Sequence, residues 1–517
     1  MESTAGTPLS SQIESIAKET ETIDDVDEEL EMLLRSAFSN CPQCKELYSD
    51  YNWCQSCEVQ KFQECFNKWT SGNDAVDNLI KETQLNALTY RSYLEWIPYS
   101  EFNDIELIAQ GGFGPVYSAI WADGPKWNFD NVTGTWVRSG QTKVALKCLD
   151  NSRNISQSFL NEVKLHQFSF VSDFVLRCYG VSQHPATRDY IMVMEYADNG
   201  DLYHYLRNHF DDISWYDKLA ILRDIAMGLT VIHSADLLHR DLHTGNVLLS
   251  LDLMQTYIAD LGLCRPSHRH VDYDEVYGSL PYVAPEVLQG EEYSKAADIY
   301  SFGIIMWEIA TGKKAYGDRA HDTRLAVEIC RGKRPDPPKD VPECYVRLMN
   351  WCWDEDQDQR PDADVLQAVI GRDWLSKLKP EVKQPPPSNS KKTTPRTSTP
   401  RKTNSTTTNT ATKTSPTNVT RSSSQRNSST QSKPLAKRNN STPTRTTTQK
   451  NSVTSPVLSA AAQEANQFKA AEKKRREALE AKKASKTDEN VKKDEELHPQ
   501  AVYTSRLLSF PDLATVT

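Results

Sequence analysis

Residues 239–246 read His-Arg-Asp-Leu-His-Thr-Gly-Asn, which is the most specific pattern in the chain. The carboxylate of Asp241 and the amide of Asn246 lie on what we expect to be a tight loop, where they can serve a hydroxyl nucleophile and a metal ion at once. Downstream, Asp260-Leu261-Gly262 offers a second hard oxygen ligand for Mg²⁺, and Ala284-Pro285-Glu286 closes the stretch. The pattern therefore predicts a magnesium-assisted site.

Two upstream features fit the same site. Residues 108–116 read IAQGGFGPV, a turn whose glycines let backbone N–H groups approach phosphate oxygens without an intervening Cβ. Lys147 ends the apolar run 144–147, and Glu162 follows in a helical stretch. An ion pair between them can aim the ammonium at the α and β phosphates of a nucleotide. Taken alone, such a turn is more often a plain hairpin, and such a pair is more often a solvated surface pair.

Taken together and in this order, the elements resemble the signature set of the eukaryotic protein kinase family. The resemblance covers residues 96–378. It implies an α+β, bilobal fold, with a small β-rich N-lobe that carries one helix and a larger helical C-lobe, flanked by disordered tails. It also implies that Asp241 is the catalytic base and that Asn246 and Asp260 hold Mg²⁺. Glu162 would fix Lys147 against the α and β phosphates of ATP.

The resemblance further implies the groups that hold ATP. Met194 would be the gatekeeper, and the backbone of residues 195–197 would form the hinge. Asp298 and the pair Glu286–Arg360 would be structural anchors of the C-lobe. The expected ATP-binding residues are Ile108, Gly111, Gly112, Gly114, Val116, Ala145, Lys147, Met194, Glu195, Ala197 and Leu248.

The class of kinase is read from three further stretches. Residues 278–286, GSLPYVAPE, resemble the serine/threonine pattern, in which a hydroxyl precedes the substrate-binding stretch. Residues 351–354, WCWD, followed by Arg360-Pro361, resemble the tyrosine-kinase-like (TKL) branch of serine/threonine kinases. The insert at 121–141 and an N-terminal cysteine cluster resemble a large fungal group within that branch.

The expected activity is transfer of the γ-phosphoryl of Mg-ATP to protein serine or threonine hydroxyls in intracellular signalling. A pseudokinase-like ATP-binding scaffold and a dual-specificity kinase are the alternatives. The expected partners are ATP and protein substrates.

Three positions depart from the family pattern. Ala109 stands where the first loop glycine usually does, and Leu261 replaces the usual Phe. His243 stands where serine/threonine kinases usually carry a Lys beside the γ-phosphate. A neutral imidazole stabilises transferring charge less than an ammonium does, so we expect a slow enzyme.

The loop between Asp260 and Glu286 carries candidate phosphorylation sites. Arg240 precedes Asp241, a pairing that in this family accompanies activation by loop phosphorylation. A phosphate on the loop can form charge-assisted bonds to that Arg. Ser267 and Tyr273 are the favoured sites, Tyr277 is a further hydroxyl, and Ser279 is expected to contact substrate.

Charge and composition divide the remainder of the 517-residue chain, whose net charge is −10. Residues 1–40 hold two basic and ten acidic side chains and are expected to be a disordered head. Residues 66–95 are expected to form a helical linker, with helical alternation from Asp74 to Glu95. Residues 379–456 are expected to be a basic, disordered Ser/Thr/Asn/Pro-rich region, since residues 381–450 hold fourteen basic side chains and one acidic. Residues 457–490 are expected to be a solvated, charged single helix, and residues 491–517 a flexible tail.

The compartment is inferred from the same composition. The apolar runs are too short to span a membrane, and no secretory leader is recognised. Eleven cysteines, an odd number, favour a reducing compartment. We expect a cytoplasmic protein that also has access to the nucleus.

Residues 41–65 contain two CxxC knuckles, Cys41–Cys44 and Cys54–Cys57. Four thiolates so arranged can close a tetrahedral structural zinc site, which a short segment without a core needs to stay folded. A redox pair and unligated thiols are the alternatives, and Cys65 is not expected to be a ligand.

The C-terminal third carries further candidate sites. The basic region could bind nucleic acid or anionic lipid, act as a nuclear import signal together with residues 473–476, or recruit signalling partners, although a solvated linker is the simpler reading. Residues 503–512 are a candidate docking peptide. The Ser/Thr-Pro steps, which are candidate sites for proline-directed kinases, are Thr394, Thr399, Ser415, Thr442 and Ser455.

Overall fold

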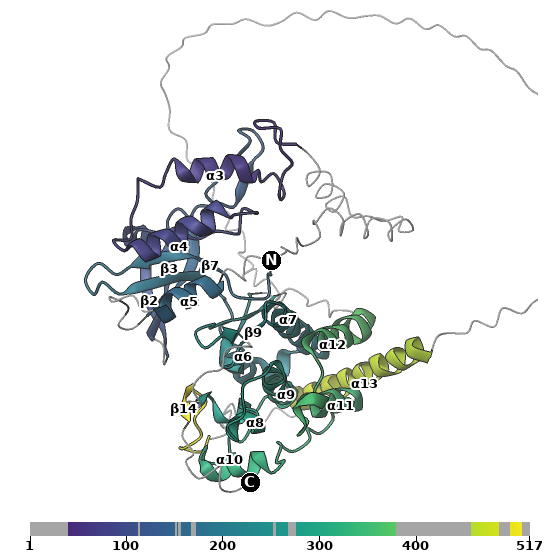
Figure 1. The fold of residues 1–517 in the computed structure, drawn as a ribbon. Coiled ribbons are helices and arrows are strands. Elements are labelled where there is room, and N and C mark those ends of the chain that lie inside the picture. The colour runs from purple at the N-terminus through teal and green to yellow at the C-terminus, as the bar shows by residue number, and fades with distance from the viewer. Residues whose placement is uncertain are drawn as a thin grey trace, which may run out of the picture. The chain divides into compact units, whose positions relative to one another are not determined.

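The computed structural model describes residues 40–111, 114–149, 152, 157–166, 172–251, 255–266, 276–378, 456–484 and 497–508, which belong to a single compact unit of the chain. Figure 1 shows helices α3 and α4 in purple, the strands of the N-terminal region in blue to teal, and a predominantly helical region in teal to green. The acidic head, the basic region, and the favoured loop sites Ser267 and Tyr273 lie outside the described residues.

The N-terminal lobe is built on one sheet with the strand order β1-β7-β8-β6-β3-β2. All neighbouring pairs are antiparallel except β1 with β7. The strands are β1 (Glu95–Trp96), β2 (Phe102–Gly111), β3 (Gly114–Trp121), β6 (Thr142–Cys148), β7 (Cys178–Gln183) and β8 (Tyr190–Glu195).

Strand β6 shows how the sheet separates its two faces. Val144 and Leu146 are buried on one face, in a cluster with residues of β3 and β8. Ala145 lies on the opposite face, and because side chains alternate along a strand, Lys147 shares that face with it. This face is covered by helices α4 (Asp74–Leu85) and α5 (Gln157–Leu165), which contribute Ile80 and Val163 to the core. Lys147 is thus held between the sheet and α5.

Helix α4 replaces the longer linker helix that the sequence predicts. It begins at Asp74, where the side chain of Asn73 accepts hydrogen bonds from the backbone N–H of Ala75 and Val76. It ends at Leu85 rather than near Glu95, because the following residues enter the core and then strand β1, with Leu94 fully buried.

The insert and the cysteine segment pack together. The insert forms a hairpin of β4 (Asn128–Asp130) and β5 (Thr135–Val137), and helix α3 (Gln55–Gln63) follows the second CxxC knuckle. Trp53 and Trp136 meet with ring centroids 5.8 Å apart, and Trp53 Nε1 donates to the carbonyl of Ala87 at 3.1 Å. The cysteine segment is therefore docked on the N-lobe.

The C-terminal lobe is helical. Its core helices are α7 (Trp215–Ser234) and α9 (Lys295–Thr311), and their buried side chains lie in one hydrophobic cluster. The side chain of Ser214 and that of Asp217 form a capping box at the start of α7. The other helices of the lobe are α6 (Leu202–His209), α8 (Pro285–Leu288), α10 (Thr323–Cys330), α11 (Glu343–Cys352) and α12 (Ala363–Gln367).

Short strand pairs and single turns complete the lobe. Strands β10 (Val247–Leu249) and β11 (Thr256–Ile258) pair next to residues 239–246, which we call the catalytic loop after the expectation above, and β9 (Leu237–Leu238) pairs with β12 (Arg265–Pro266). Strand β13 (Val276–Gly278) pairs with β14 (Arg506–Leu508), which lies more than two hundred residues later in the chain. The single 3₁₀ turns are η1 (Tyr99–Glu101), η3 (Phe210–Asp212), η4 (Thr244–Asn246), η5 (Leu280–Tyr282), η6 (Gln357–Gln359) and η8 (Leu375–Lys377), and η7 (Ala368–Trp374) is a short π-helix.

Helix α13 (Pro456–Ala484) is packed on the C-lobe, so the expectation of a solvated helix is wrong. Phe468 is fully buried, with its ring 5.6 Å from that of Trp215 and 5.0 Å from that of Trp374. The carboxylate of Glu472 accepts the backbone N–H of Trp215 at 2.9 Å, at the positive N-terminal end of α7. A single aromatic side chain with a helix-capping carboxylate thus docks a helix that has a thin apolar stripe.

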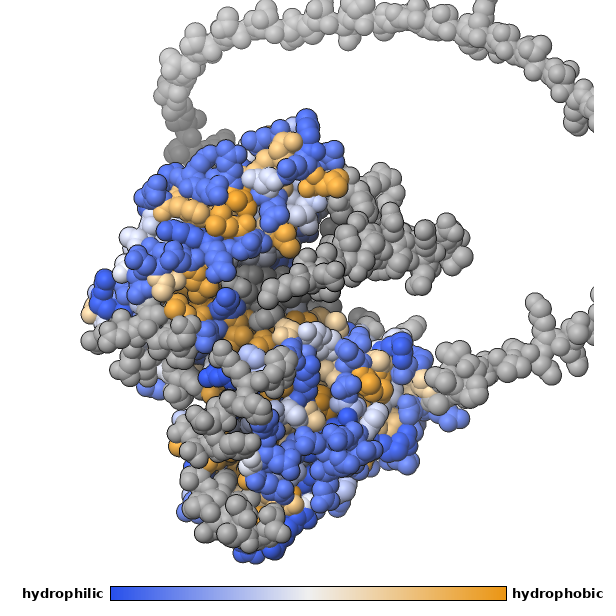
Figure 2. Space-filling view, viewed as in Figure 1, coloured by the Kyte–Doolittle hydropathy of each residue, from blue (hydrophilic) through white to orange (hydrophobic). Residues whose placement is uncertain are grey.

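The described surface is largely hydrophilic. On the face shown in Figure 2, blue residues cover most of the described helical region and are interrupted by small orange patches. Among the helices that the structure describes, none combines the length and the apolarity that crossing a membrane requires.

Candidate active site and cysteine cluster

The glycine-rich turn joins β2 to β3. Gly111 and Gly114 are paired residues at the end of this hairpin, and Ala109 pairs with Val116. Gly114 adopts φ +123°, a conformation that side chains disfavour, which explains a glycine there. Gly112 lies outside the described residues. The described residues therefore form the two arms of a β-hairpin, whereas the tip of the turn lies outside the described residues.

Lys147, Glu162 and Asp260 meet in one ion-pair network. Lys147 Nζ lies 2.8 Å from Glu162 Oε1 and 2.9 Å from Asp260 Oδ1. Burial works to lower the pKa of Lys147, but the two carboxylates outweigh it and raise that pKa above its usual range. Burial likewise opposes ionisation of Asp260, and Lys147 overcomes it and lowers the pKa of that carboxyl. Lys147 and Asp260 are therefore both charged at neutral pH.

The catalytic-loop residues are held by Asp298. Its carboxylate accepts the backbone N–H of His239 at 2.8 Å and of Arg240 at 2.9 Å, and it lies 2.9 Å from His233 Nε2. Asp298 is 1% exposed, so these donors replace the water that the charge has lost. The geometry fits the anchoring role expected for this residue.

Asp241 and Asn246 face each other across the loop. Asn246 Nδ2 lies 2.9 Å from the backbone carbonyl of Asp241 and 3.1 Å from its Oδ2. Asp241 is 5% exposed. Two residues later, Nδ1 of the His243 ring accepts the backbone N–H of Gly245 at 3.0 Å. The loop therefore presents a carboxylate and an amide oxygen close together.

A buried network beneath this loop was not found from the sequence. Lys314 Nζ lies 2.8 Å from Thr244 Oγ1 and 3.5 Å from Glu308 Oε2, and it is 2.9 Å from the hydroxyl of Tyr282. Burial lowers the pKa of Lys314, although Glu308 opposes the shift. Lys and Glu six residues apart at the end of a helix carry no distinctive sequence signal, so only the fold reveals this support.

The expected adenine slot is partly assembled. Ala145 and Met194 are partners in the β6–β8 pairing, and both pack in the same cluster as Leu248. Ile108 is 47% exposed on β2. Glu195 at the expected hinge accepts the hydroxyl of Tyr257 at 3.1 Å, and Ala197 follows it.

The loop after Asp260 is described at its two ends. Leu261 is buried in the C-lobe cluster, which fits an apolar replacement for Phe. Tyr277 lies in strand β13. Ser279, which directly follows this strand, is buried, with 2% of its surface exposed. Arg360 forms the expected bidentate pair with Glu286, at 2.7 and 2.8 Å.

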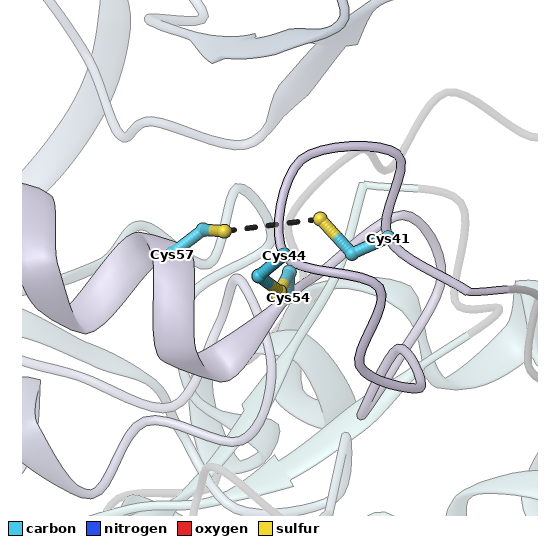
Figure 3. Close-up of side chains that lie close together, drawn as sticks. All are labelled: Cys41, Cys44, Cys54 and Cys57. Atoms are coloured by element: carbon cyan, nitrogen blue, oxygen red, sulfur yellow. Dashed lines mark hydrogen bonds between the residues drawn. The ribbon is translucent and has the colours of Figure 1, made fainter.

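The four cysteines of the two CxxC knuckles form a second cluster (Figure 3). Their sulfur atoms all lie within 4.8 Å of one another, with Cys41 and Cys57 at 3.8 Å and Cys44 and Cys54 at 3.3 Å. Burial opposes ionisation of Cys41, yet the backbone N–H groups of Cys44 and Gln43 lower the pKa of its thiol to about 7. Burial raises the pKa of Cys54 to about 11. Cys65 is exposed and lies outside this group.

Comparison with known proteins identifies the family. Residues 102–370 match the model of the protein tyrosine and serine/threonine kinase family, and the chain belongs to that family. It is 29% identical to the probable serine/threonine-protein kinase pats1 of Dictyostelium discoideum, over 63% of this chain and 10% of that protein. It is 32% identical to the RGS domain-containing serine/threonine-protein kinase A of the same organism, over 57% of this chain and 24% of that protein. It is 28% identical to mitogen-activated protein kinase kinase kinase 7 of Bos taurus, over 53% of this chain and 44% of that protein. The match thus covers less than half of each of these relatives.

Proposed function

We propose that this chain is a protein serine/threonine kinase that transfers the γ-phosphoryl group of Mg-ATP to protein hydroxyls. The observation that carries the proposal is the position of Lys147 Nζ, within 2.9 Å of both Glu162 and Asp260, while Asp241 and Asn246 face each other on the catalytic loop. In this family, such an assembled ion pair is a condition for phosphoryl transfer. Serine/threonine-protein kinases among the relatives support the choice of acceptor.

The residues divide the chemistry between them. Asp241 would accept the proton of the acceptor hydroxyl, and Lys147 would neutralise the α and β phosphates while Glu162 keeps it in place. Asp260 and Asn246 supply a carboxylate and an amide oxygen, which are hard donors that suit Mg²⁺. When bound, the metal would neutralise the charge that develops between the β and γ phosphates. Catalysis in this arrangement is positioning and charge stabilisation, so each group acts through its geometry.

The direct test measures transfer from labelled Mg-ATP to a generic basic protein. Wild type runs beside Lys147→Met and Asp260→Asn, and the labelled amino acid is identified after hydrolysis. Label on Ser or Thr that both variants lose is the expected result. Label on Tyr would contradict the serine/threonine assignment. No label above the variants, with ATP binding retained, would favour the ATP-binding scaffold.

Within the family, we propose membership of the TKL branch. The supporting features are residues 351–354, the Arg360-Pro361 step and the insert at 121–141, which the structure folds as the β4–β5 hairpin.

We also propose a cytoplasmic location with access to the nucleus. Imaging of the tagged chain before and after deletion of residues 381–455 would test it, and a location restricted to another compartment would contradict it.

For the cysteine cluster, we propose one structural zinc ion held by Cys41, Cys44, Cys54 and Cys57. Zinc–sulfur bonds of about 2.3 Å in a tetrahedron place the sulfur atoms about 3.8 Å apart, and the sulfurs of Cys41 and Cys57 lie at that separation. Four thiolates leave no open position for a substrate, so the zinc would be structural. Elemental analysis of the purified chain should find about one zinc per molecule; a metal-free, fully folded preparation would contradict the proposal.

A further inference from the structure

The last described segment, residues 497–508, lies across the C-lobe at the catalytic loop. Its strand β14, yellow in Figure 1, pairs antiparallel with β13, so that Arg506 faces Gly278 and Leu508 faces Val276. Strand β13 belongs to the loop between Asp260 and Glu286, where kinases of this family meet their substrates. Residues 506–508 therefore have the extended, strand-paired conformation in which peptides bind to sheet edges.

Contacts on both sides of Ser505 fix the segment. On the N-terminal side, the hydroxyl of Tyr503 donates to the carbonyl of Ala315 at 2.8 Å, and its ring lies 4.7 Å from that of His321. On the C-terminal side, Leu508 is 6% exposed and joins the C-lobe core, whereas Leu507 is 44% exposed. The segment is thus anchored two residues before and three residues after Ser505.

Between these anchors, the hydroxyl of Ser505 reaches the carboxylate of Asp241. Its Oγ lies 2.7 Å from Oδ1 and 2.5 Å from Oδ2. A carboxylate can only accept, so the serine O–H donates to Asp241. The proton of Ser505 therefore points at the group to which we assign the role of base.

His243 completes this arrangement. Its Nδ1 accepts the backbone N–H of Gly245, which places the ring proton on Nε2. Nε2 lies 3.1 Å from Ser505 Oγ and therefore donates to it. The hydroxyl is held by one donor and one acceptor, which leaves an oxygen lone pair free for attack. A side chain that departs from the family pattern thus orients this serine.

We propose that Ser505 is an intramolecular phosphoacceptor of this kinase, an inference that rests on the proposed function. The Oγ of Ser505 attacks the γ-phosphorus of ATP, and a new O–P bond forms. The bond from that phosphorus to the β–γ bridging oxygen breaks, ADP leaves, and the hydroxyl proton passes to Asp241. The products are ADP and phosphoserine 505.

The modified segment would not stay in place. A phosphate of about −1.5 to −2 charge beside the carboxylate of Asp241 is repelled. Phosphorylation of Ser505 would therefore release β14 from β13 and free the acceptor position. Before that step, the unmodified segment occupies the position that a protein substrate needs, so it competes with other acceptors.

The test uses the full chain, dephosphorylated during purification and then given Mg-ATP, with phosphosites mapped by mass spectrometry over time. Ser505 should be modified, and its first-order rate should stay constant over roughly a hundredfold range of protein concentration, because an intramolecular acceptor has a fixed effective concentration. Ser505→Ala should lose the phosphate on this peptide. Thr504→Ala, which changes the exposed neighbouring hydroxyl, should keep it.

A matched pair of variants tests the docked conformation. Leu508→Asp should slow labelling of Ser505 by about tenfold or more, because it removes a buried anchor. Leu507→Asp, at the exposed neighbouring position, should label Ser505 at the wild-type rate. Equal rates in both variants would contradict docking as the cause.

A generic basic protein in the same reaction separates this inference from the proposed function. If the basic protein is labelled and Ser505 is not, or if labelling of Ser505 rises in proportion to protein concentration, the intramolecular acceptor is wrong and the kinase assignment stands. If neither is labelled, the kinase assignment itself is wrong. These outcomes are read on the wild-type chain and do not depend on a variant that might misfold.

Discussion

Lys147 Nζ lies 2.8 Å from Glu162 Oε1, across the boundary between strand β6 and helix α5. Because Lys147 lies in strand β6 and Glu162 lies in helix α5, this short distance shows that α5 packs against the sheet. The same ammonium reaches Asp260 at 2.9 Å, which connects the N-lobe to the loop that follows the catalytic loop. The ion pair therefore brings together three residues to which we assign roles in phosphoryl transfer.

Replacing Lys147 should remove most of the activity. In Lys147→Met, the α and β phosphates lose their cation, and phosphate transfer should fall by about 10²–10³-fold, the usual cost of removing one charge-stabilising group. Lys143→Met is the matched control, since Lys143 is exposed on the same strand. Single-turnover transfer to a basic protein measures both. If phosphate transfer falls by the same factor in both variants, the loss comes from the removed positive charge on strand β6 and not from the specific position of Lys147.

Helix α13 should leave the C-lobe when its aromatic anchor is removed. Phe468 is fully buried between Trp215 and Trp374, and truncating a buried Phe typically costs about 3–5 kcal/mol. Phe468→Ala should therefore raise the hydrogen-exchange rate of residues 456–484 and expose them to protease. The neighbouring Lys469 is exposed, and Lys469→Ala should change neither readout. If hydrogen exchange and protease resistance of residues 456–484 are unchanged in Phe468→Ala, the ion pairs of α13 are sufficient to keep the helix on the C-lobe.

His166 should make the stability of the fold depend on pH. Burial and the nearby Lys147 lower the pKa of His166 to about 4, and its Nδ1 donates to the carbonyl of Leu176 at 3.3 Å. In the unfolded chain, the pKa of His166 returns to about 6.5. Between about pH 6.5 and 4, the unfolded state therefore binds a proton that the folded state does not bind, and the free energy of unfolding decreases as the pH is lowered. From pH 7 to 5, this one group should cost about 2 kcal/mol.

Urea unfolding at the two pH values measures this effect. His166→Gln should lose less stability than wild type on going from pH 7 to pH 5. His209→Gln, at an exposed histidine, should lose as much as wild type. If all three proteins lose stability equally, His166 titrates normally in the folded state.

Removing zinc should unfold the cysteine segment and leave the C-lobe intact. A short segment depends on its metal because it cannot bury enough apolar surface alone. Chelation should therefore speed hydrogen exchange in residues 41–63 and leave α7 protected. Cys57→Ser should abolish zinc binding, whereas Cys65→Ser should retain about one zinc per chain. Protection of residues 41–63 without metal would show that docking through Trp53 suffices.

The sequence predicts which groups of the candidate active site lie close together, because several of them share short contiguous motifs. Asp241 and Asn246 share one loop, so their spacing already restricts how far apart they can lie. The pairing of Lys147 with Glu162 also follows, since a strand end and a nearby helix form a local unit. The buried group of Lys314, Thr244 and Glu308 does not follow, because its members are ordinary residues that only the packing of α9 against the catalytic loop brings together.

The two segments beyond residue 456 show the same limit. Composition predicts a helix near residues 457–490, and the structure has one at Pro456–Ala484. Its thin apolar stripe gives no sign of docking, because the partners of Phe468 and Glu472, which are Trp215 and Trp374, lie far away in the sequence. The sequence offers residues 503–512 as a candidate docking peptide; residues 503–508 lie on the kinase domain, and residues 509–512 lie outside the described residues.

The sequence by itself therefore indicated the family and the bilobal fold, and it singled out the residues that we propose to bind ATP, because motif spacing encodes local geometry. Tertiary structure alone decided which distant residues meet. Ser505 and Asp241 are 264 residues apart in the chain, and no local pattern relates them. Their contact depends on strand β14 pairing with β13 and on Leu508 entering the C-lobe core, and such long-range pairing becomes visible only when the whole chain has folded.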